Sequence, residues 1–339
     1  MYLLFVIGVV IIVKGGDWFV DGAVWLAEIT RIPKFIIGAT ILSVATTLPE
    51  IIVSTIAAVE GHGILLSGVP DAVALSQDKV GMAIGNGIGS VICNTAMILA
   101  ISIIFTPSVI KRKDFAPKSA ILIIAVAALF LLSLSGSFSM VGAVILLIIF
   151  ALYIFENVRS AKSEHSEAGS EAPAKDKKSV ILNILRIVVG AACIVIGSRL
   201  LVDNGSKIAS SWGVSEAIIG VTIVAIGTSL PELVTAITSI IKKQSSMSVG
   251  NIIGANVIDT TLILATCSFV YGGKLPVSVQ NIYLDFPIAI IVSAIAAVPT
   301  IIKGRFSRWQ GFMMLAIYIV YLLISTVWLA PYLSLFGAK

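Results

Sequence analysis

The stretch "GATILSVATTLPE" occupies residues 38–50, and a close copy, "GVTIVAIGTSLPE", occupies residues 220–232. A second pair follows in the same order, with "GNGIGSVICN" at residues 85–94 and "GNIIGANVID" at residues 250–259. Shared composition alone does not explain why Leu-Pro-Glu and Gly-Asn recur in the same order in both halves. The sequence therefore predicts an internal duplication.

The composition around these motifs is that of an integral membrane protein. Of 339 residues, 58% are hydrophobic and only 12% are charged, and the mean hydropathy is +1.06. A helix needs about 20 apolar residues to cross the hydrocarbon core of a bilayer. Hydropathy predicts ten such spans, centred near residues 11, 47, 93, 125, 147, 193, 227, 260, 292 and 321.

A polar linker divides these ten spans into two groups of five. It reads "ENVRSAKSEHSEAGSEAPAKDKKS" and has no apolar periodicity, so residues 156–180 are expected to be unstructured. An odd number of spans per repeat inserts the second copy upside down. We therefore predict an all-α membrane protein with ten transmembrane helices in two inverted five-helix repeats, residues 1–155 and 181–339. The motifs occupy residues 38–54 and 85–94 in the first repeat, and residues 220–236 and 250–259 in the second.

The distribution of basic residues predicts the orientation of the chain. Most of the 23 Lys and Arg residues fall on one side of a ten-span arrangement, including those in the linker. Basic loops stay in the cytoplasm, which predicts a cytoplasmic linker, extracellular termini and a multi-pass location in the plasma membrane. This topology explains the net charge of +5 without a nucleic-acid partner. The first repeat also has a longer connection between its motifs, residues 61–79, which is expected to be an external loop.

Each Leu-Pro-Glu motif carries the elements of a cation site. Proline has no N–H and clashes with the carbonyl four residues earlier, so Pro49 and Pro231 are predicted to break their helices at the membrane midplane. Freed carbonyls at that depth require a cavity or an ion. Glu50 and Glu232 follow the two prolines directly.

Further oxygen atoms accompany these carboxylates. The hydroxyls of Thr46, Thr47, Thr228 and Ser229 belong to the same turns, and the second motifs can add Ser90, Asn94 and Asp259. Hard cations such as Ca²⁺ prefer six to eight oxygen ligands of this mixed kind. Charged side chains inside a bilayer are costly and mark functional sites. Four other acids lie nearer the predicted span ends and are expected to be solvated: Asp17, Asp21, Asp203 and Asp285.

The paired motifs resemble the two alpha repeats of the sodium/calcium exchanger family, within the cation/calcium antiporters. The resemblance covers essentially the whole chain. It implies ten transmembrane helices, of which the second, third, seventh and eighth form the core while the first and sixth slide as a gate. It also implies four cation positions that Ca²⁺ and Na⁺ occupy alternately.

The resemblance assigns roles to matched residues. Glu50 and Glu232 would bridge the Ca²⁺ position, which the backbone carbonyls of Thr46 and Thr228 complete. The other matched groups would form the Na⁺ positions and the central polar position: the hydroxyls of Thr47, Ser90 and Ser229, the carbonyls of Ser43 and Ala225, and the side chains of Asn94 and Asp259. The transported ions are the only small molecules that the resemblance implies, and it implies no cofactor. The lipid bilayer is the expected surrounding, and no obligate protein partner is expected.

One departure from the family pattern leaves the driving ion open. Ala255 stands where the other half has Ser90, so one Na⁺ position loses a hydroxyl ligand. The leading hypothesis is an antiporter that exchanges Na⁺ for Ca²⁺ by alternating access, and the alternative is an H⁺-driven antiporter of Ca²⁺ or another divalent cation such as Mg²⁺. A passive channel would not need two interchangeable half-sites. An enzyme is not expected, because the sequence has no nucleophile elbow or zinc-binding His pair.

Overall fold

The computed structural model describes residues 1–107, 109–167, 176–212 and 225–325. In this part of the chain, eight helical segments are long and apolar enough to cross a membrane. Two further apolar helices, Leu230–Ile241 and Arg308–Leu323, are shorter. The described residues therefore contain eight full-length candidate spans, compared with the ten predicted.

The elements follow one another along the chain as helices, some of which contain π-helical turns, labelled η. The first half contains α1 (Tyr2–Thr30), α2 (Lys34–Ile37), η1 (Gly38–Leu42), α3 (Ser43–Leu66), α4 (Ala72–Cys93), η2 (Asn94–Leu99), α5 (Ala100–Phe105), α6 (Arg112–Ser133) and α7 (Met140–Glu167). The second half contains α8 (Lys177–Ser211), α10 (Ala225–Thr228), α11 (Leu230–Ile241), α12 (Ser245–Ile258), η4 (Asp259–Ile263), α13 (Leu264–Tyr271), η5 (Asn281–Asp285), α14 (Phe286–Lys303) and α15 (Arg308–Leu323). Two short strands, β1 (Ser137–Phe138) and β2 (Leu275–Pro276), pair antiparallel.

The chain folds into two compact units, and each takes segments from both halves of the sequence. Unit 1 comprises Met1–Thr47, Ser108–Ile110 and Phe155–Ala255, and unit 2 comprises Leu48–Pro107, Lys111–Ile154 and Asn256–Lys339. Each unit therefore combines residues from both sides of the 156–180 linker.

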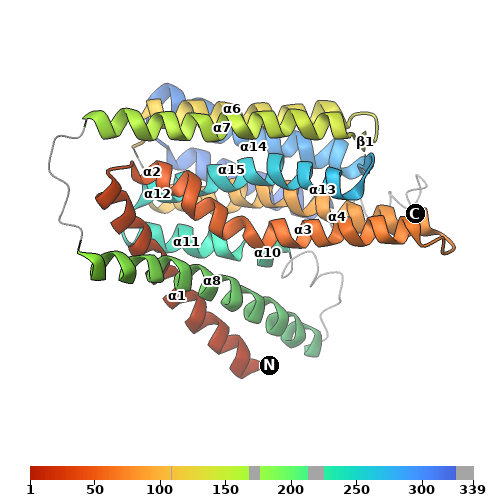
Figure 1. Ribbon diagram of the computed structural model, residues 1–339, viewed down its shortest axis with the longest axis horizontal. Helices are drawn as coiled ribbons and strands as arrows, with labels where there is room; N and C mark the ends of the chain where they lie inside the picture. The colour runs from red at the N-terminus through yellow and green to blue at the C-terminus, as the bar shows by residue number, and fades with distance from the viewer. Residues whose placement is uncertain (108, 168–175, 213–224, 326–339) are drawn as a thin grey trace. The chain divides into compact units, whose positions relative to one another are not determined.

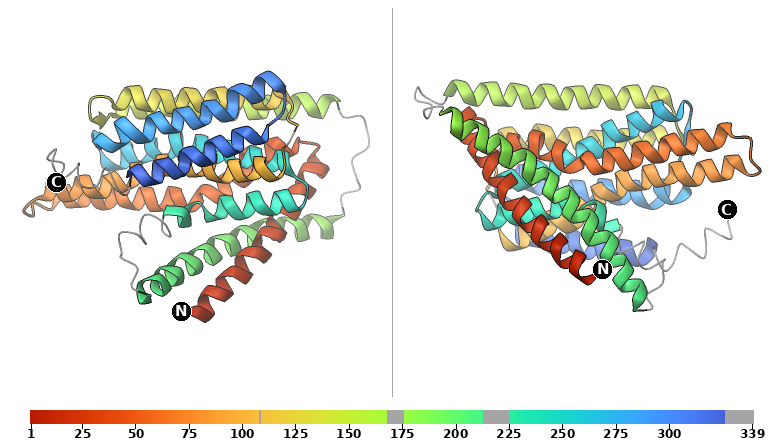
Figure 2. Two further views of the ribbon diagram at one scale, coloured as in Figure 1. Left: turned by 180° about the vertical axis from the view of Figure 1, so that it is seen from behind. Right: turned by 60° about the horizontal axis from the view of Figure 1, so that its bottom comes forward.

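In unit 1, helices α1 and α8 lie side by side along much of their length (Figures 1 and 2). Glycines bring their backbones together: a Cβ atom at Gly15 would lie 2.9 Å from the carbonyl oxygen of Gly190, and one at Gly190 would lie 2.6 Å from the backbone nitrogen of Phe19. Small residues allow this close approach between membrane helices, where dispersion contacts replace the hydrophobic effect.

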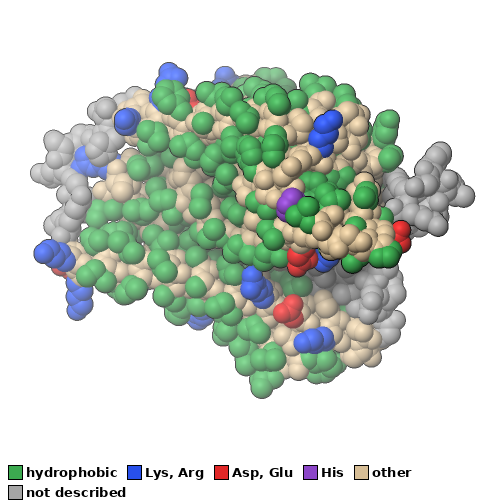
Figure 3. Space-filling view, turned by 45° about the vertical axis from the view of Figure 1, so that its right-hand side comes forward, with side chains coloured by type: hydrophobic (Ala, Val, Ile, Leu, Met, Phe, Trp, Pro, Cys, Tyr) green, Lys and Arg blue, Asp and Glu red, His purple; other side chains and the backbone are tan. Residues whose placement is uncertain are grey.

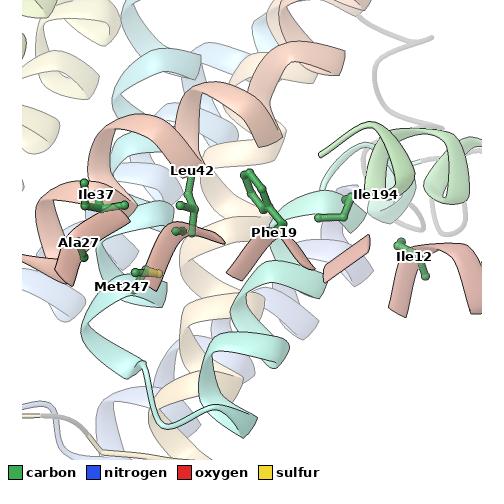
Figure 4. Packing of buried hydrophobic residues seen from close by; sticks show 8 residues of the cluster. Ile12, Phe19, Ala27, Ile37, Leu42, Ile194 and Met247 are labelled. Carbon is green, nitrogen blue, oxygen red and sulfur yellow. The ribbon is translucent and has the colours of Figure 1, made fainter. Parts of the chain in front are cut away.

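The apolar core of unit 1 joins α1 to four other segments (Figure 4). Phe19 and Ala27 of α1 belong to one buried cluster with residues of α2, η1, α8 and α12, namely Ile37, Leu42, Ile194 and Met247. This cluster brings Leu42 of the first Leu-Pro-Glu motif together with Met247 of α12, which precedes the motif at residues 250–259.

In unit 2, α4, α6, α13, α14 and α15 pack around buried aromatic and aliphatic side chains. Phe130 of α6 lies against Phe286 of α14, with ring centroids 6.1 Å apart. The strand pair places Phe138 opposite Leu275, and both side chains are buried. Gly311 sits where a Cβ would lie 2.7 Å from the carbonyl oxygen of Ala100, so α15 packs directly on the backbone of α5.

The surface is apolar, as a bilayer requires. Hydrophobic side chains cover most of the face shown in Figure 3, with charged side chains scattered among them. Leu3 on α1 is 73% exposed, and large aliphatic side chains are also exposed on α3, α7 and α8. In water an apolar surface of this extent would be unstable, so the outward faces of these helices are suited to lipid contact.

The structure shows only one of the two predicted helix breaks. Helix α3 runs through Pro49 without interruption, while Ser229 separates α10 from α11 ahead of Pro231. The prediction was wrong at Pro49, because a proline removes a single backbone hydrogen bond and the remaining bonds of a long helix can hold it together. The irregular turn of that helix is η1, which ends just before Ser43.

The polar segments are more helical than predicted. Helix α7 extends into the 156–180 linker as far as Glu167, and α8 begins within it at Lys177. Residues 168–175 of the linker lie outside the described part. The expected external loop at 61–79 is also mostly helical, because α3 continues to Leu66 and α4 begins at Ala72. Ser76 anchors this extension, with its hydroxyl donating to the carbonyl of Gly61 at 2.7 Å.

Three of the four acids expected to be solvated are partly or fully exposed. Asp17 and Asp21 pair with Lys242, whose Nζ lies 3.5 Å and 2.6 Å from their Oδ1 atoms, and Asp203 is exposed. Asp285 is the exception and is only 3% exposed. Its position near a span end was a poor guide, because η5 turns its side chain into the bundle of unit 2.

Candidate functional site

Glu232 is the centre of the polar cluster in unit 1. Its side chain is 1% exposed at the start of α11, and its Oε1 atom accepts a 3.4 Å hydrogen bond from the hydroxyl of Thr47 on α3. The Glu232 Oε2 atom and the Ser229 hydroxyl are buried with no hydrogen-bond partner among the described residues. These oxygen atoms have lone pairs free for a cation.

Asn251 links three helices around this cluster. Its amide nitrogen donates to the Thr235 hydroxyl on α11 at 2.9 Å, and its amide oxygen accepts from the Thr46 hydroxyl at 3.4 Å. The Asn251 side chain, on α12, is fully buried. Asn251 therefore connects the Leu-Pro-Glu motif of the second repeat to that of the first.

Glycines of the second motif allow the same close packing. A Cβ atom added at Gly250 would clash with the carbonyl of Phe35, and one added at Gly38 would clash with the carbonyl of Met247. A Cβ at Gly254 would lie 2.6 Å from the carbonyl oxygen of Ala39. At these positions a larger side chain would push α12 away from the turn that leads into Ser43.

Glu50, on α3, lies in unit 2 and is 1% exposed. One turn further along, Ser54 accepts a 2.9 Å hydrogen bond from the amide of Asn86 on α4. Asn86 thus links α4 to α3 within the first repeat, much as Asn251 links α12 to α11 in the second.

Asn94 and Asp259 both begin π-helical turns, η2 and η4, at matching positions of the two second motifs. Both are 1% exposed. Asn256 donates to the hydroxyl of Thr95 at 2.7 Å, which joins these two regions. Gly87 lies where a Cβ would be 3.2 Å from the carbonyl oxygen of Asp259, so α4 packs directly on η4. π-Helical turns often occur at functional sites.

The remaining predicted residues are placed as follows. The Ser43 carbonyl accepts hydrogen bonds from the Thr47 hydroxyl at 2.6 Å and from the Thr46 hydroxyl at 3.4 Å. Ala225 and Thr228 begin and end α10. The Ser90 hydroxyl and the Asn94 amide oxygen are buried without a hydrogen-bond partner among the described residues, and Ala255 is fully buried. Residues 220–224 of the predicted motif lie outside the described part.

The predicted site residues thus fall in both units. Unit 1 holds Ser43, Thr46, Thr47, Ala225, Thr228, Ser229 and Glu232, and unit 2 holds Glu50, Ser90, Asn94 and Asp259. Within each unit, residues far apart in the sequence come together, as Thr47 and Glu232 do in unit 1. In the described residues no group of three or more His, Cys, Asp and Glu side chains could hold a metal ion. A cation here would therefore draw on hydroxyl, amide and carbonyl oxygens as well as carboxylates.

The sequence leaves two roles open for the Gly-Asn pairs, helix packing with a hydrogen-bonding Asn or a place beside the site. The structure shows the hydrogen bonds, because Asn86 and Asn251 each bond to a neighbouring helix. Sequence analysis missed two features of this region: the hydrogen bond between Asn256 and Thr95, and the π-helical turns at Asn94 and Asp259. No sequence pattern indicated the π-helical turns.

Comparison with known proteins identifies the family of this chain. A family model described as sodium/calcium exchanger protein matches residues 1–158 and 182–327. An uncharacterized membrane protein of Methanocaldococcus jannaschii is 30% identical, with 93% of this chain and 95% of that protein covered. The sodium/calcium exchanger MaX1 of Methanosarcina acetivorans is 24% identical, with 95% of this chain and 97% of that protein covered.

A solved structure shows the same fold. The sodium-calcium exchanger NCX_Mj, soaked with 2.5 mM Na⁺ and 10 mM Sr²⁺, matches with a TM-score of 0.78 and 29% sequence identity, covering 96% of this chain and 97% of that chain. This match and the family model both extend over nearly the whole sequence. The chain, with its two Leu-Pro-Glu motifs and buried carboxylates, belongs to the sodium/calcium exchanger family of cation/calcium antiporters.

Proposed function

We propose that this protein exchanges Na⁺ for Ca²⁺ across the plasma membrane, at a midplane site to which Glu50 and Glu232 contribute the bridging carboxylates. The observation that carries the proposal is the hydrogen bond from Thr47 to the buried carboxylate of Glu232, which joins the Leu-Pro-Glu motifs of the two repeats. Carboxylate and hydroxyl oxygens are the donors that a hard cation prefers.

In this proposal, the negative charge of the buried carboxylates makes Na⁺ and Ca²⁺ exchange for one another. Glu50, Glu232 and Asp259 are buried, and uncompensated charges in a membrane are costly. In this proposal, cations compensate the carboxylates, and Na⁺ and Ca²⁺ compete because they share ligands. Ca²⁺ takes the carbonyls of Thr46 and Thr228, while Na⁺ and the central position use Ser43, Thr47, Ser90, Asn94, Ala225, Ser229 and Asp259.

Alternating access requires the site to open to each side in turn. We assign the sliding pair to α1 and α8, since their glycine contacts bring them together as one element of unit 1. In this arrangement the chain has ten transmembrane helices in two inverted repeats, residues 1–155 and 181–339, joined by the 156–180 linker.

The proposal is tested by uptake of ⁴⁵Ca²⁺ into proteoliposomes that contain the purified protein. Vesicles loaded with NaCl are compared with vesicles loaded with choline chloride, with and without an imposed pH gradient. Uptake driven by the outward Na⁺ gradient is the expected result. Uptake driven only by the pH gradient would replace this proposal with the H⁺-driven antiporter, and uptake with no gradient dependence would indicate a channel.

Ala255 allows the Na⁺ positions to be tested separately. The Ala255→Ser variant restores the hydroxyl that Ser90 supplies in the other repeat, in a fully buried position. We expect the Na⁺ concentration for half-maximal exchange to change severalfold while the corresponding Ca²⁺ concentration changes little. Equal changes for both ions would contradict the assignment of this position to Na⁺.

A further inference from the structure

Basic side chains gather at one end of unit 2, where α6 begins and a turn joins α14 to α15. The two stretches, residues 111–118 and 303–309, contain seven Lys and Arg residues and a single acid, Asp114. Asp114 and Lys118 are buried. The other six basic side chains are exposed and form the basic surface of unit 2: Lys111, Arg112, Lys113, Lys303, Arg305 and Arg308.

Direct contacts hold the two stretches of the basic surface together. The guanidinium group of Arg112 donates a hydrogen bond to the carbonyl of Ile302, which lies 190 residues away in the sequence. Beneath it, the buried rings of Phe115 and Phe306 meet edge to face, with centroids 5.5 Å apart. The fold therefore assembles one basic surface from segments that belong to different halves of the chain.

The turn that carries Arg305 and Arg308 has a fixed backbone. Ser307 and Gln310 form a capping box at the start of α15, in which the Ser307 N–H donates to the side-chain oxygen of Gln310 at 2.9 Å. The Gln310 side-chain nitrogen donates to the carbonyl of Ile295 at 2.8 Å, which ties the turn to α14. A rigid backbone lowers the entropic cost of binding a ligand.

The protein itself supplies little negative charge to balance this surface. In the part of the chain that the structure describes, no carboxylate forms an ion pair with Arg112, Lys303, Arg305 or Arg308. Like charges that are clustered in this way repel one another. An anion from outside the chain would relieve that repulsion.

Exposed apolar side chains lie next to the basic residues on the same helices. Ile302 on α14 is 66% exposed, and Trp309 and Phe312 on α15 are 45% and 59% exposed. Tryptophan is enriched at the level of the lipid headgroups, and the Lys303 ammonium lies 5.9 Å from the centroid of the Trp309 ring. A ligand with an anionic head and apolar tails matches both parts, whereas a water-soluble anion matches only the charges.

We propose that the basic surface binds the headgroup of an anionic phospholipid, with Arg305 and Arg308 as phosphate ligands and Trp309 and Phe312 against the acyl chains. Guanidinium groups bind phosphate through paired hydrogen bonds. In the orientation predicted from the basic residues, this end of unit 2 faces the inner leaflet, where anionic lipids are concentrated. Lipid binding here does not depend on the proposed ion exchange.

Binding is tested by native mass spectrometry of the purified protein, titrated with phosphatidylglycerol or with phosphatidylcholine of the same acyl chains. We expect phosphatidylglycerol to bind more tightly. Arg305→Gln/Arg308→Gln should weaken its binding about 25-fold, since each basic side chain near an anionic lipid contributes about fivefold. Equal affinities of the two lipids for the wild-type protein, or unchanged binding in the double variant, would overturn the proposal.

A matched control separates a defined site from general attraction by positive charge. Lys177→Gln/Lys178→Gln removes the same charge from an exposed basic pair at the start of α8 and should bind phosphatidylglycerol as the wild type does. An equal loss of affinity in both double variants would overturn the site. Arg305→Lys/Arg308→Lys keeps the charge but loses the paired hydrogen bonds, so its affinity should be intermediate. Wild-type affinity in that variant would contradict the role of the two arginines as phosphate ligands.

Competition distinguishes a lipid from free phosphate. Inorganic phosphate in large excess, compared with chloride at the same ionic strength, should leave phosphatidylglycerol bound. Displacement by phosphate but not by chloride would overturn the lipid as the ligand and indicate a site for free phosphate.

The position of the lipid is tested in nanodiscs of phosphatidylcholine that contain a small share of brominated lipid, which quenches nearby tryptophan fluorescence. The difference between the wild type and Trp309→Phe gives the fluorescence of Trp309. Brominated phosphatidylglycerol should quench this fluorescence more than brominated phosphatidylcholine at the same mole fraction, and Arg305→Gln/Arg308→Gln should abolish that difference. Equal quenching by the two lipids in the wild type would contradict a site beside Trp309.

Discussion

At the scale of single residues, Glu50 and Glu232 make the most specific prediction. Each is 1% exposed, and Glu→Gln at either position removes a charge and retains the size of the side chain. We expect each change to weaken Ca²⁺ binding at least about 30-fold, equivalent to about 2 kcal/mol. The measurement is the Ca²⁺ concentration dependence of uptake in proteoliposomes.

The same helix supplies the control for this prediction. Glu60 also lies on α3, but it is exposed and pairs with Lys79 at 2.8 Å. Exposed ion pairs contribute little to stability, so Glu60→Gln should transport as the wild type does. A loss of uptake in Glu60→Gln as large as in Glu50→Gln would show that any neutralised acid on α3 impairs the protein, and would contradict the assigned role of Glu50.

At the scale of residues, the sequence predicted burial correctly where the same acidic residue recurs in both copies of a motif. The duplicated Leu-Pro-Glu motifs predicted that Glu50 and Glu232 would be buried in a polar setting, and the structure confirms their burial. Asp285 was misjudged because position along a span does not report which way a side chain points. Only the π-helical turn η5 and the packing of α15 place it in the interior.

At the scale of secondary-structure elements, the buried amide of Asn251 holds α12 to α11 and α3. The change Asn251→Ala leaves the hydroxyls of Thr235 and Thr46 without this partner, which should lower the free energy of unfolding by about 1–3 kcal/mol. Thermal unfolding in detergent measures this. Because Thr46 adjoins the proposed Ca²⁺ position, the Ca²⁺ concentration for half-maximal uptake should also rise.

Asn86→Ala is the comparison for that change. Asn86 donates to Ser54 and links only two helices, α4 and α3. We expect a smaller loss of stability than for Asn251→Ala. If the two losses were equal and Ca²⁺ uptake were unaffected in both, the three-helix contact of Asn251 would have no special role in positioning the site.

The close contact between α1 and α8 predicts that a side chain at Gly190 destabilises the protein. A methyl group at Gly190 would lie 2.6 Å from the backbone nitrogen of Phe19, so Gly190→Ala must separate the two helices. We expect lower thermal stability and slower exchange. Gly63→Ala, in α3, has open space around the added methyl group and gains up to about 1 kcal/mol of helix propensity, so its stability should be unchanged or higher. Destabilisation of both variants alike would contradict the packing described here.

The elements themselves were predictable where hydrophobicity was continuous. The long helices α1, α6, α7, α8 and α14 each contain a predicted span centre. The helical hairpin at residues 61–79 and the extension of α7 into the linker were not predicted, because polar helices carry no apolar periodicity. Helix continuity through Pro49 depends on hydrogen bonds along the whole of α3 and not on the proline alone.

At the scale of the whole molecule, the basic residues predict a cytoplasmic linker and extracellular termini. This orientation can be measured after Cys93, Cys193 and Cys267 are replaced, by labelling single cysteines in sealed cells with an impermeant thiol reagent. Ser67→Cys, between α3 and α4, should react from outside, and Lys177→Cys, at the start of α8, only after permeabilisation. The reverse pattern would invert the topology and assign the linker to the outside.

The two repeats differ in the helix that carries each Leu-Pro-Glu motif, and this difference has a mechanical consequence. In the first repeat α3 is continuous through Pro49, whereas Ser229 interrupts the corresponding helix of the second repeat. A continuous helix bends stiffly, while a chain with an interruption can pivot about it at low energetic cost. In the proposed exchange cycle we therefore expect the helix of the second half to bend at Ser229, while α3 moves as one rod.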